Sequence, residues 1–198
     1  CVSSFVRENF LATSPMKPGK VFVMNNGIDL RIFNPERFDK SGMRAAYGIP
    51  QNATVIGMTG RISPMKGHAE FIRAAAMLLE KTERNLFFVM GGGASVGEDD
   101  YATEIFNLAK ELLPENKYSF IGHQPDLAGL LSTMDVYVFP SHRESFGNVL
   151  LEAMAMQLPI VAVNAGGVPD MITSGENALC VRPQHPAEIF SSVQKLLN

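Results

Sequence analysis

The hydrophobic pattern of the chain alternates between two periods. Short continuous runs of apolar residues are typical of strands buried on both faces. Between these runs, apolar residues recur three and four positions apart, as on one face of a helix. The predicted strands are residues 21–24, 54–59, 86–90, 118–121, 136–139, 159–163 and 178–181. The predicted helices are residues 35–47, 69–81, a stretch around 105–113, 126–133, 146–155, a short turn from 168, and 186–197.

Strands that alternate with helices through short connections predict one fold class. This is an α/β fold, a single Rossmann-like domain whose parallel sheet carries helices on both faces. Residues 1–11 form a short helical pattern with too little apolar surface to stand alone. We therefore expect residues 1–17 to be a linker or the remnant of a preceding domain, and residues 18–198 to be the folded domain. Because the sequence starts at Cys1 without an initiator Met, we expect a fragment of a longer protein.

Composition narrows the class of protein. Hydrophobic residues make up 46% and charged residues 19%, which excludes disorder and indicates a globular domain. The net charge of −3 gives no electrostatic reason to expect a nucleic acid or a membrane surface as partner. No apolar run approaches the roughly 18 residues of a transmembrane helix, although peripheral membrane attachment of the full-length protein stays open. Two cysteines make no disulfide framework, so we expect a cytoplasmic protein.

Ligands of parallel α/β sheets bind beyond the carboxyl ends of the strands. The polar and glycine-rich loops of this chain all fall at that edge, at residues 60–61, 91–93, 122–123 and 140–148. In the last of these, a buried strand passes through a polar turn into a helix. Backbone N–H groups of Phe146, Gly147 and Asn148 at the helix start are predicted to be free to meet an anion.

Two carboxylates flank this turn. Glu144 precedes the helix, and Glu152 follows eight residues later. At 100° per residue, Val149 and Leu150 face the core whereas Glu152 points away from it. The two acids could form a general acid/base pair, as in glycosidases, or accept hydrogen bonds from sugar hydroxyls. A helix-capping acid followed by a solvated helix acid is a third interpretation, and the residues alone leave all three open.

The segment 60–67 carries two cations at a helix entry. Arg61 and Lys66 lie five residues apart after a predicted strand, a spacing that suits a clamp on a diphosphate. The segment lacks the Lys-Ser or Lys-Thr pair of a Walker A loop. Two solvated surface cations are the plainer interpretation.

Gly91–Gly93 matches the dinucleotide-binding fingerprint only in part, since a third glycine is not at the required offset. We expect a loop that approaches a ligand or a neighbouring domain closely. An NAD-dependent oxidoreductase is disfavoured because the fingerprint is incomplete.

The histidines show no metal-ligand spacing with cysteines or acids, so no metal is expected. We expect them to lie at the surface or behind the site; they are His68, His123, His142 and His185. Neither cysteine has an activating neighbourhood, and no G-x-S-x-G motif is present.

Taken together, these segments resemble the family 4 glycosyltransferases, also called group 1, and specifically the C-terminal half of their two-domain GT-B fold. The resemblance covers residues from about 21 to the end. The matching segments follow the family order at residues 26–29, 60–67, 120–122, 140–155 and 166–169. The pair of glutamates with Phe146-Gly147 and Ala153-Met154-Ala155 is its most specific part.

The resemblance implies a transferase that moves a sugar from a UDP-, GDP- or ADP-sugar to an acceptor hydroxyl with retention of configuration and without a metal or other cofactor. It implies that Glu144 contacts the donor sugar and that Glu152 accepts hydrogen bonds from the ribose. The residues expected around the diphosphate are Gly60, Arg61, Lys66, Phe146, Gly147, Asn148 and Val149. Those expected near the base are Gly122, His123 and Gln124.

The chain departs from the family pattern at two positions. Gly92 stands where the family often has Asp, and Asp170 stands where it often has Glu. The resemblance also implies that an N-terminal domain, absent from this chain, binds the acceptor, so this fragment is predicted to be inactive alone. A non-catalytic nucleotide-sugar binding module and half of a nucleotide-sugar epimerase are the alternatives.

Overall fold

A computed structural model describes residues 1–95 and 97–198, and its central element is one parallel sheet of six strands. The strands are β1 (Thr54–Thr59), β2 (Leu86–Gly91), β3 (Tyr118–Gly122), β4 (Val136–Phe139), β5 (Ile160–Val163) and β6 (Leu179–Val181). Their spatial order is β3-β2-β1-β4-β5-β6. This is the strand order of the doubly wound Rossmann fold, so the predicted fold class is confirmed.

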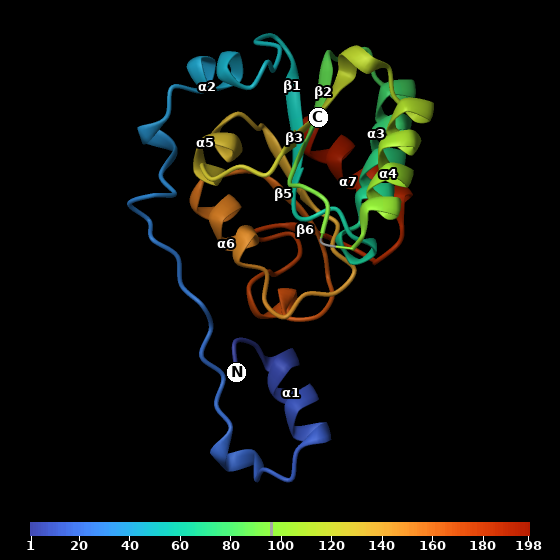
Figure 1. Ribbon diagram of the computed structural model, residues 1–198. Helices are drawn as coiled ribbons and strands as arrows, with labels where there is room; N and C mark the ends of the chain where they lie inside the picture. The colour runs from blue at the N-terminus through green and yellow to red at the C-terminus, as the bar shows by residue number, and fades with distance from the viewer. Residues whose placement is uncertain (96) are drawn as a thin grey trace.

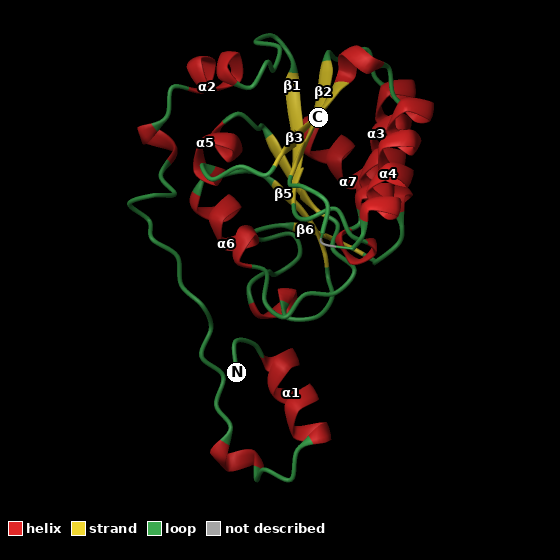
Figure 2. Ribbon diagram, viewed as in Figure 1, coloured by secondary structure: helices red, strands yellow, loops and turns green. Residues whose placement is uncertain are grey.

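Helices cover both faces of the sheet (Figures 1 and 2). The α-helices are α1 (Ser4–Thr13), α2 (Lys40–Ala46), α3 (His68–Lys81), α4 (Asp99–Leu112), α5 (Leu127–Ser132), α6 (Asn148–Ala155) and α7 (Pro186–Leu197). Short 3-10 turns occur at Pro18–Lys20, Pro35–Arg37, Pro64–Lys66, Glu115–Lys117 and Val168–Asp170. Helices α3, α4 and α7 lie on one face, and α2, α5 and α6 on the other.

The core consists of two layers of apolar side chains, one on each face of the sheet. Along β1, Ile56 and Met58 pack in the layer under α3, α4 and α7, whereas Val55 packs in the opposite layer. Adjacent residues of β2 divide in the same way, with Phe88 in the first layer and Phe87 in the second. Because the side chains of β2, β4 and β5 are all buried on one face or the other, these strands have continuous apolar sequences.

Two predicted elements are wrong. Residues 21–24 belong to no strand: Phe22 and Met24 are 74% and 80% exposed, and the segment is extended chain beside Cys1. The predicted helix 35–47 is broken, since a 3-10 turn ends before α2 begins at Lys40. The Asp39 carboxylate accepts a hydrogen bond from the Ser41 N–H and so caps a new helix at that point.

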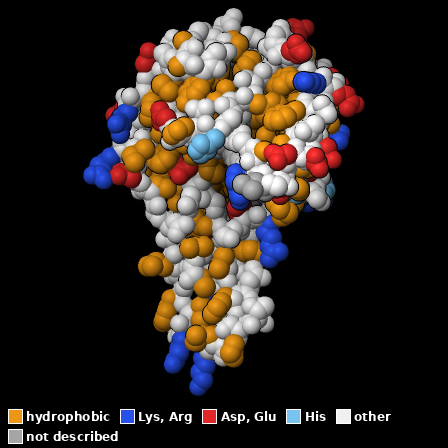
Figure 3. All heavy atoms as spheres, viewed as in Figure 1, with side chains coloured by type: hydrophobic (Ala, Val, Ile, Leu, Met, Phe, Trp, Pro, Cys, Tyr) orange, Lys and Arg blue, Asp and Glu red, His pale blue; other side chains and the backbone are white. Residues whose placement is uncertain are grey.

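Residues 1–34 form the N-terminal arm: α1 lies beyond the carboxyl ends of the strands, and the arm then runs along the side of the domain that carries α6 and α5 toward α2 (Figure 1). Helix α1 contains no buried residue, and hydrophobic side chains are spread over the arm surface (Figure 3). The expected domain boundary after residue 17 stays a prediction. In the described ranges, no helix has the length and apolar character needed to cross a bilayer.

Candidate functional site

The order of the sheet reverses between β1 and β4, because β2 and β3 lie on one side of β1 whereas β5 and β6 lie beyond β4. In a doubly wound sheet this switch point opens a crevice at the carboxyl ends of the two central strands. The loop 60–67 leaves β1 and the loop 140–147 leaves β4. Both predicted binding segments therefore meet at the crevice.

Lys66 and Glu144 form an ion pair across this crevice, between Nζ and Oε1. Their side chains are only 23% and 16% exposed. The sequence analysis assigned Lys66 to the diphosphate and Glu144 to the donor sugar, whereas in the structure the two side chains contact each other. Partial burial strengthens such a pair relative to a surface ion pair, since water screens it less.

The ion pair borders a cavity of about 280 Å³ at the start of α6, lined also by Val2, Asn26 and residues 145–149. The backbone N–H groups of residues 146–149 donate no hydrogen bond to any described residue. Asn148 Oδ1 accepts a hydrogen bond from Asn26 Nδ2 at 2.8 Å. The cavity thus combines a cation, a carboxylate and free N–H donors, a set that suits a ligand with both a phosphate and hydroxyls.

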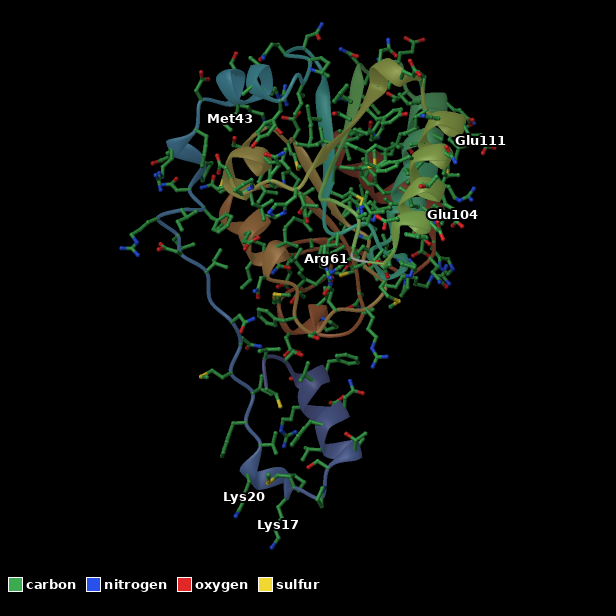
Figure 4. The ribbon with its side chains drawn as sticks, viewed as in Figure 1. Lys17, Lys20, Met43, Arg61, Glu104 and Glu111 are labelled. Carbon is green, nitrogen blue, oxygen red and sulfur yellow. The ribbon has the colours of Figure 1, made fainter. Side chains whose placement is uncertain are left out.

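A second cavity, of about 240 Å³, adjoins the first and shares Lys66 and Val149 with it. Predicted site residues form its polar side; they are Gly60, Arg61, His123 and Gln124. Arg61 is exposed and lies at the carboxyl edge of the sheet (Figure 4). Gly122 does not line the cavity; its carbonyl instead accepts a hydrogen bond from the Gly92 N–H at 2.7 Å.

The second cavity also has an apolar wall that the sequence analysis missed. It is formed by Leu127, Leu130 and Phe139. Leu127 and Leu130 lie three positions apart on α5, within the predicted helix 126–133, and neither was predicted to be a site residue. They reach the cavity because α5 follows β3 and so begins beside the carboxyl edge of the sheet, a placement that helical spacing alone cannot specify.

Gly92 explains the close approach predicted for the glycine loop. A Cβ at Gly92 would lie 1.9 Å from the Gly60 carbonyl oxygen, and its φ of 128° is unfavourable for other residues. Within this chain, the close approach is between two loops of the same site. The aspartate that the family often carries here would clash in this backbone.

Glu152 lies in the second turn of α6 and lines neither cavity. It is half-buried, and burial raises the pKa of its carboxyl. The buried Tyr137 hydroxyl shares a 2.8 Å hydrogen bond with Thr59 Oγ1, and Thr59 lines the second cavity. Burial raises the pKa of Tyr137, and the charges of Glu152 and Glu144 add to the effect. Tyr137 thus lies beneath the region that the two acids flank.

His68, at the start of α3, is 1% exposed, and its Nδ1 finds no hydrogen-bond partner among the described residues. Burial, aided by the charge of Lys66, lowers the pKa of this imidazole to about 4. His142, in the loop that carries Glu144, places Nε2 3.2 Å from Glu70 Oε1. No cluster of three or more His, Cys, Asp or Glu side chains suited to a metal occurs in the described part of the chain.

Comparison with known proteins identifies one family. The family profile described as "Glycosyl transferases group 1" matches residues 39–198. The chain is 33% identical over 186 residues to the D-inositol 3-phosphate glycosyltransferase of Corynebacterium efficiens, covering 91% of this chain and 43% of that protein. It is 35% identical to the protein of that name from Saccharomonospora viridis, covering 86% of this chain and 40% of the relative. The chain therefore spans less than half the length of these relatives.

Solved structures show the same likeness. Anabaena HepE, solved in complex with UDP and glucose, is 27% identical with a TM-score of 0.91, covering 100% of this chain and 52% of that chain. The C-terminal domain of the group 1 glycosyl transferase LpcC from Francisella tularensis is 30% identical with a TM-score of 0.76, covering 86% of this chain and 88% of that domain. With a family profile that matches most of its length, the chain belongs to the group 1 glycosyl transferases.

Proposed function

We propose that this chain is the donor-binding half of a retaining glycosyltransferase that takes its sugar from a UDP-sugar. The observation that carries the proposal is the Lys66–Glu144 ion pair at the start of α6, between two adjoining cavities. One cavity offers an apolar wall for a base, and the other offers N–H donors and a carboxylate. A nucleotide sugar has this sequence of groups, with its diphosphate in the middle.

Arg61 and Lys66 hold the diphosphate in this proposal, together with the N–H groups of residues 146–149. Each charge-assisted hydrogen bond of this kind contributes about 1.5–3 kcal/mol. A bound diphosphate attracts Lys66 Nζ and releases the Glu144 carboxylate from its ion pair. Glu144 then accepts hydrogen bonds from hydroxyls of the donor sugar.

The base occupies the second cavity, with His123 and Gln124 on its polar side and Gly122 behind them. Glu152 accepts hydrogen bonds from the ribose. The choice of uracil is supported by HepE, which was solved with UDP and with UDP-glucose and is 27% identical to this chain.

Acceptor binding and the remaining catalytic groups come, in this proposal, from an N-terminal domain outside this chain. A crevice with one wall can neither exclude water nor orient an acceptor. We therefore expect no sugar transfer by this chain alone, and transfer without a metal or other cofactor by the full-length enzyme, in the cytoplasm. Detectable transfer by the isolated chain would contradict this part of the proposal.

Calorimetric titration with uridine, UDP, GDP and ADP tests the donor site. Replacing both Arg61 and Lys66 by Ala should reduce the advantage of UDP over uridine by roughly 100-fold or more, since two charge-assisted contacts are lost. Arg84→Ala with Lys110→Ala, which removes two exposed cations elsewhere, is the matched control. An unchanged ratio in the first variant would reject the clamp, and a preference for GDP or ADP would reject uracil.

The epimerase alternative is tested with the full-length protein. Incubation with UDP-glucose in the absence of acceptor should leave the sugar unchanged in configuration, as chromatography of the nucleotide sugars would show. Isomerised UDP-sugar would favour the epimerase.

A further inference from the structure

The backbone that carries Glu144 is fixed from two sides. On one side, the Gly167 N–H donates to the Glu144 carbonyl oxygen at 2.8 Å. On the other, the Ser3 hydroxyl donates to the carbonyl oxygen of the next residue, Ser145, at 2.5 Å. Ser3 is fully buried and also caps α1, because its Oγ accepts the Val6 N–H at 3.2 Å. One side chain thus joins the start of α1 to the loop that carries Glu144.

The three segments meet without space for a side chain between them. A Cβ at Gly167 would lie 2.2 Å from the Ser145 carbonyl oxygen and 2.8 Å from Ser3 Oγ. Atoms packed at this density transmit displacement, because a shift of one forces its neighbours to move. A change in the position of α1 therefore displaces the backbone of Glu144.

Asp170 completes the connection. It follows the glycine turn, and its Oδ2 accepts the Ser4 N–H at 2.7 Å and Asn25 Nδ2 at 3.5 Å. Ser4 is the first residue of α1, where free N–H groups and the helix dipole favour a negative charge. The Arg143 guanidinium lies 4.8 Å from the centre of the Phe5 ring and adds a cation–π contact between the same two segments.

We propose that Ser3 and Asp170 are positioning residues: by fastening α1 to the loop 143–146, they hold the Glu144 carboxylate where the donor sugar binds. The inference rests on the proposed role of Glu144. It predicts an effect mainly on the sugar, because Arg61, Lys66 and His123 lie on other loops, and the N–H donors of residues 146–149 are held by the buried side chains of Phe146 and Leu150. Affinity for UDP should therefore be nearly independent of the connection, and the gain in affinity that the sugar adds should depend on it.

The test first finds which of UDP-glucose, UDP-galactose and UDP-N-acetylglucosamine binds most tightly. It then measures the ratio of the dissociation constant of UDP to the dissociation constant of that UDP-sugar. Ser3→Ala and Asp170→Ala should each reduce this ratio roughly three- to tenfold, the loss expected for one hydrogen bond. UDP affinity should stay within about twofold, which also shows that the variants are folded. Asp170→Glu, which keeps the charge, should restore most of the ratio. Glu176→Ala removes an exposed carboxylate from the following turn and is the matched control.

A double-mutant cycle assigns the effect to Glu144. In a Glu144→Ala background, Ser3→Ala and Asp170→Ala should change the ratio no further. Unchanged ratios in the single variants or additive losses in the cycle would overturn the inference. So would a loss of UDP affinity that parallels the loss of UDP-sugar affinity. The inference also fails if the unaltered protein binds no UDP-sugar more tightly than it binds UDP. Absence of UDP binding by the unaltered protein would instead reject the proposed function.

Discussion

The buried imidazole of His68 should make the stability of this domain depend on pH. His68 is 1% exposed at the start of α3, and the nearby positive charge of Lys66 helps to lower its pKa. Because the pKa in the folded state is about 4 against an ordinary 6.5, the folded protein keeps this ring neutral where the unfolded chain takes up a proton. The contribution of the neutral ring to stability is therefore complete above pH 6.5 and is lost as the pH falls toward 4.

The size of the effect follows from the two pKa values. The interval of about 2.5 pH units corresponds to about 3 kcal/mol in full, and to about 2 kcal/mol between pH 7 and pH 5. Other ionisable groups also titrate in this range, so the absolute change in stability does not isolate His68. Comparison with His68→Gln does, because glutamine keeps a polar side chain of similar size but has no proton to gain.

Urea unfolding at pH 7 and pH 5 measures the effect. Between these pH values, the free energy of unfolding of the unaltered protein should fall about 2 kcal/mol more than that of His68→Gln. His185→Gln, a substitution of an exposed histidine, should behave like the unaltered protein. An equal pH dependence in the unaltered protein and His68→Gln would refute the reasoning, because it would mean that the folded state protonates His68 without penalty.

Three further substitutions test other features. Gly92→Ala should lower the free energy of unfolding by about 2–4 kcal/mol in urea titrations, since the added Cβ meets a backbone oxygen. The control Gly93→Ala, whose Cβ has nothing within 4 Å, should change it by less than about 0.5 kcal/mol. Equal effects of the two substitutions would contradict the loop packing. Glu152→Ala should narrow the calorimetric preference for UDP over deoxy-UDP, and an unchanged preference would reject the ribose contact. Arg44→Met should lower the free energy of unfolding by about 2–4 kcal/mol in urea titrations, because the Thr133 and Ala53 carbonyl oxygens lose the buried guanidinium that donates to them, whereas Asp135 keeps its pairing with Lys40. A loss below about 1 kcal/mol would show that the guanidinium contacts are dispensable.

The apolar runs along the sequence predicted the six strands of the sheet but also a strand in the N-terminal arm that does not form, and both results have one physical reason. The runs at residues 54–59 and 136–139 are apolar because both faces of a central strand are buried, and that condition is visible in the sequence itself. The run at residues 21–24 has the same composition, but whether a strand forms depends on a partner with free backbone groups. No sheet strand lies beside it in the described chain, so its side chains stay exposed. Whether a segment pairs with a neighbouring strand depends on the fold, and the composition of the segment alone does not predict it.

The same limit applies to the site. Lys66 and Glu144 are separated by 78 residues, and only the strand order that places β1 beside β4 brings them together. Spacing could identify each as a candidate because each stands at the carboxyl end of a predicted strand. It could not reveal that these two side chains form one ion pair.

The positions of Glu144 and Glu152 also distinguish the three interpretations that the sequence left open for these acids. A glycosidase-type pair requires both carboxylates to face the same bond, but Glu144 lines the cavity at the start of α6 whereas Glu152 lines neither cavity. A helix-capping acid followed by a solvated helix acid does not fit either, because no side chain caps α6, Glu144 is instead paired with Lys66, and Glu152 is half-buried. The low exposure of Lys66 likewise argues against a solvated surface cation. In the function proposed above, Glu144 is a carboxylate paired with a cation that the diphosphate of the donor attracts. That proposal predicts that a nucleotide sugar, which supplies a diphosphate to Lys66 and hydroxyls to Glu144 at the same time, binds more tightly than a nucleoside diphosphate, which lacks the transferred sugar.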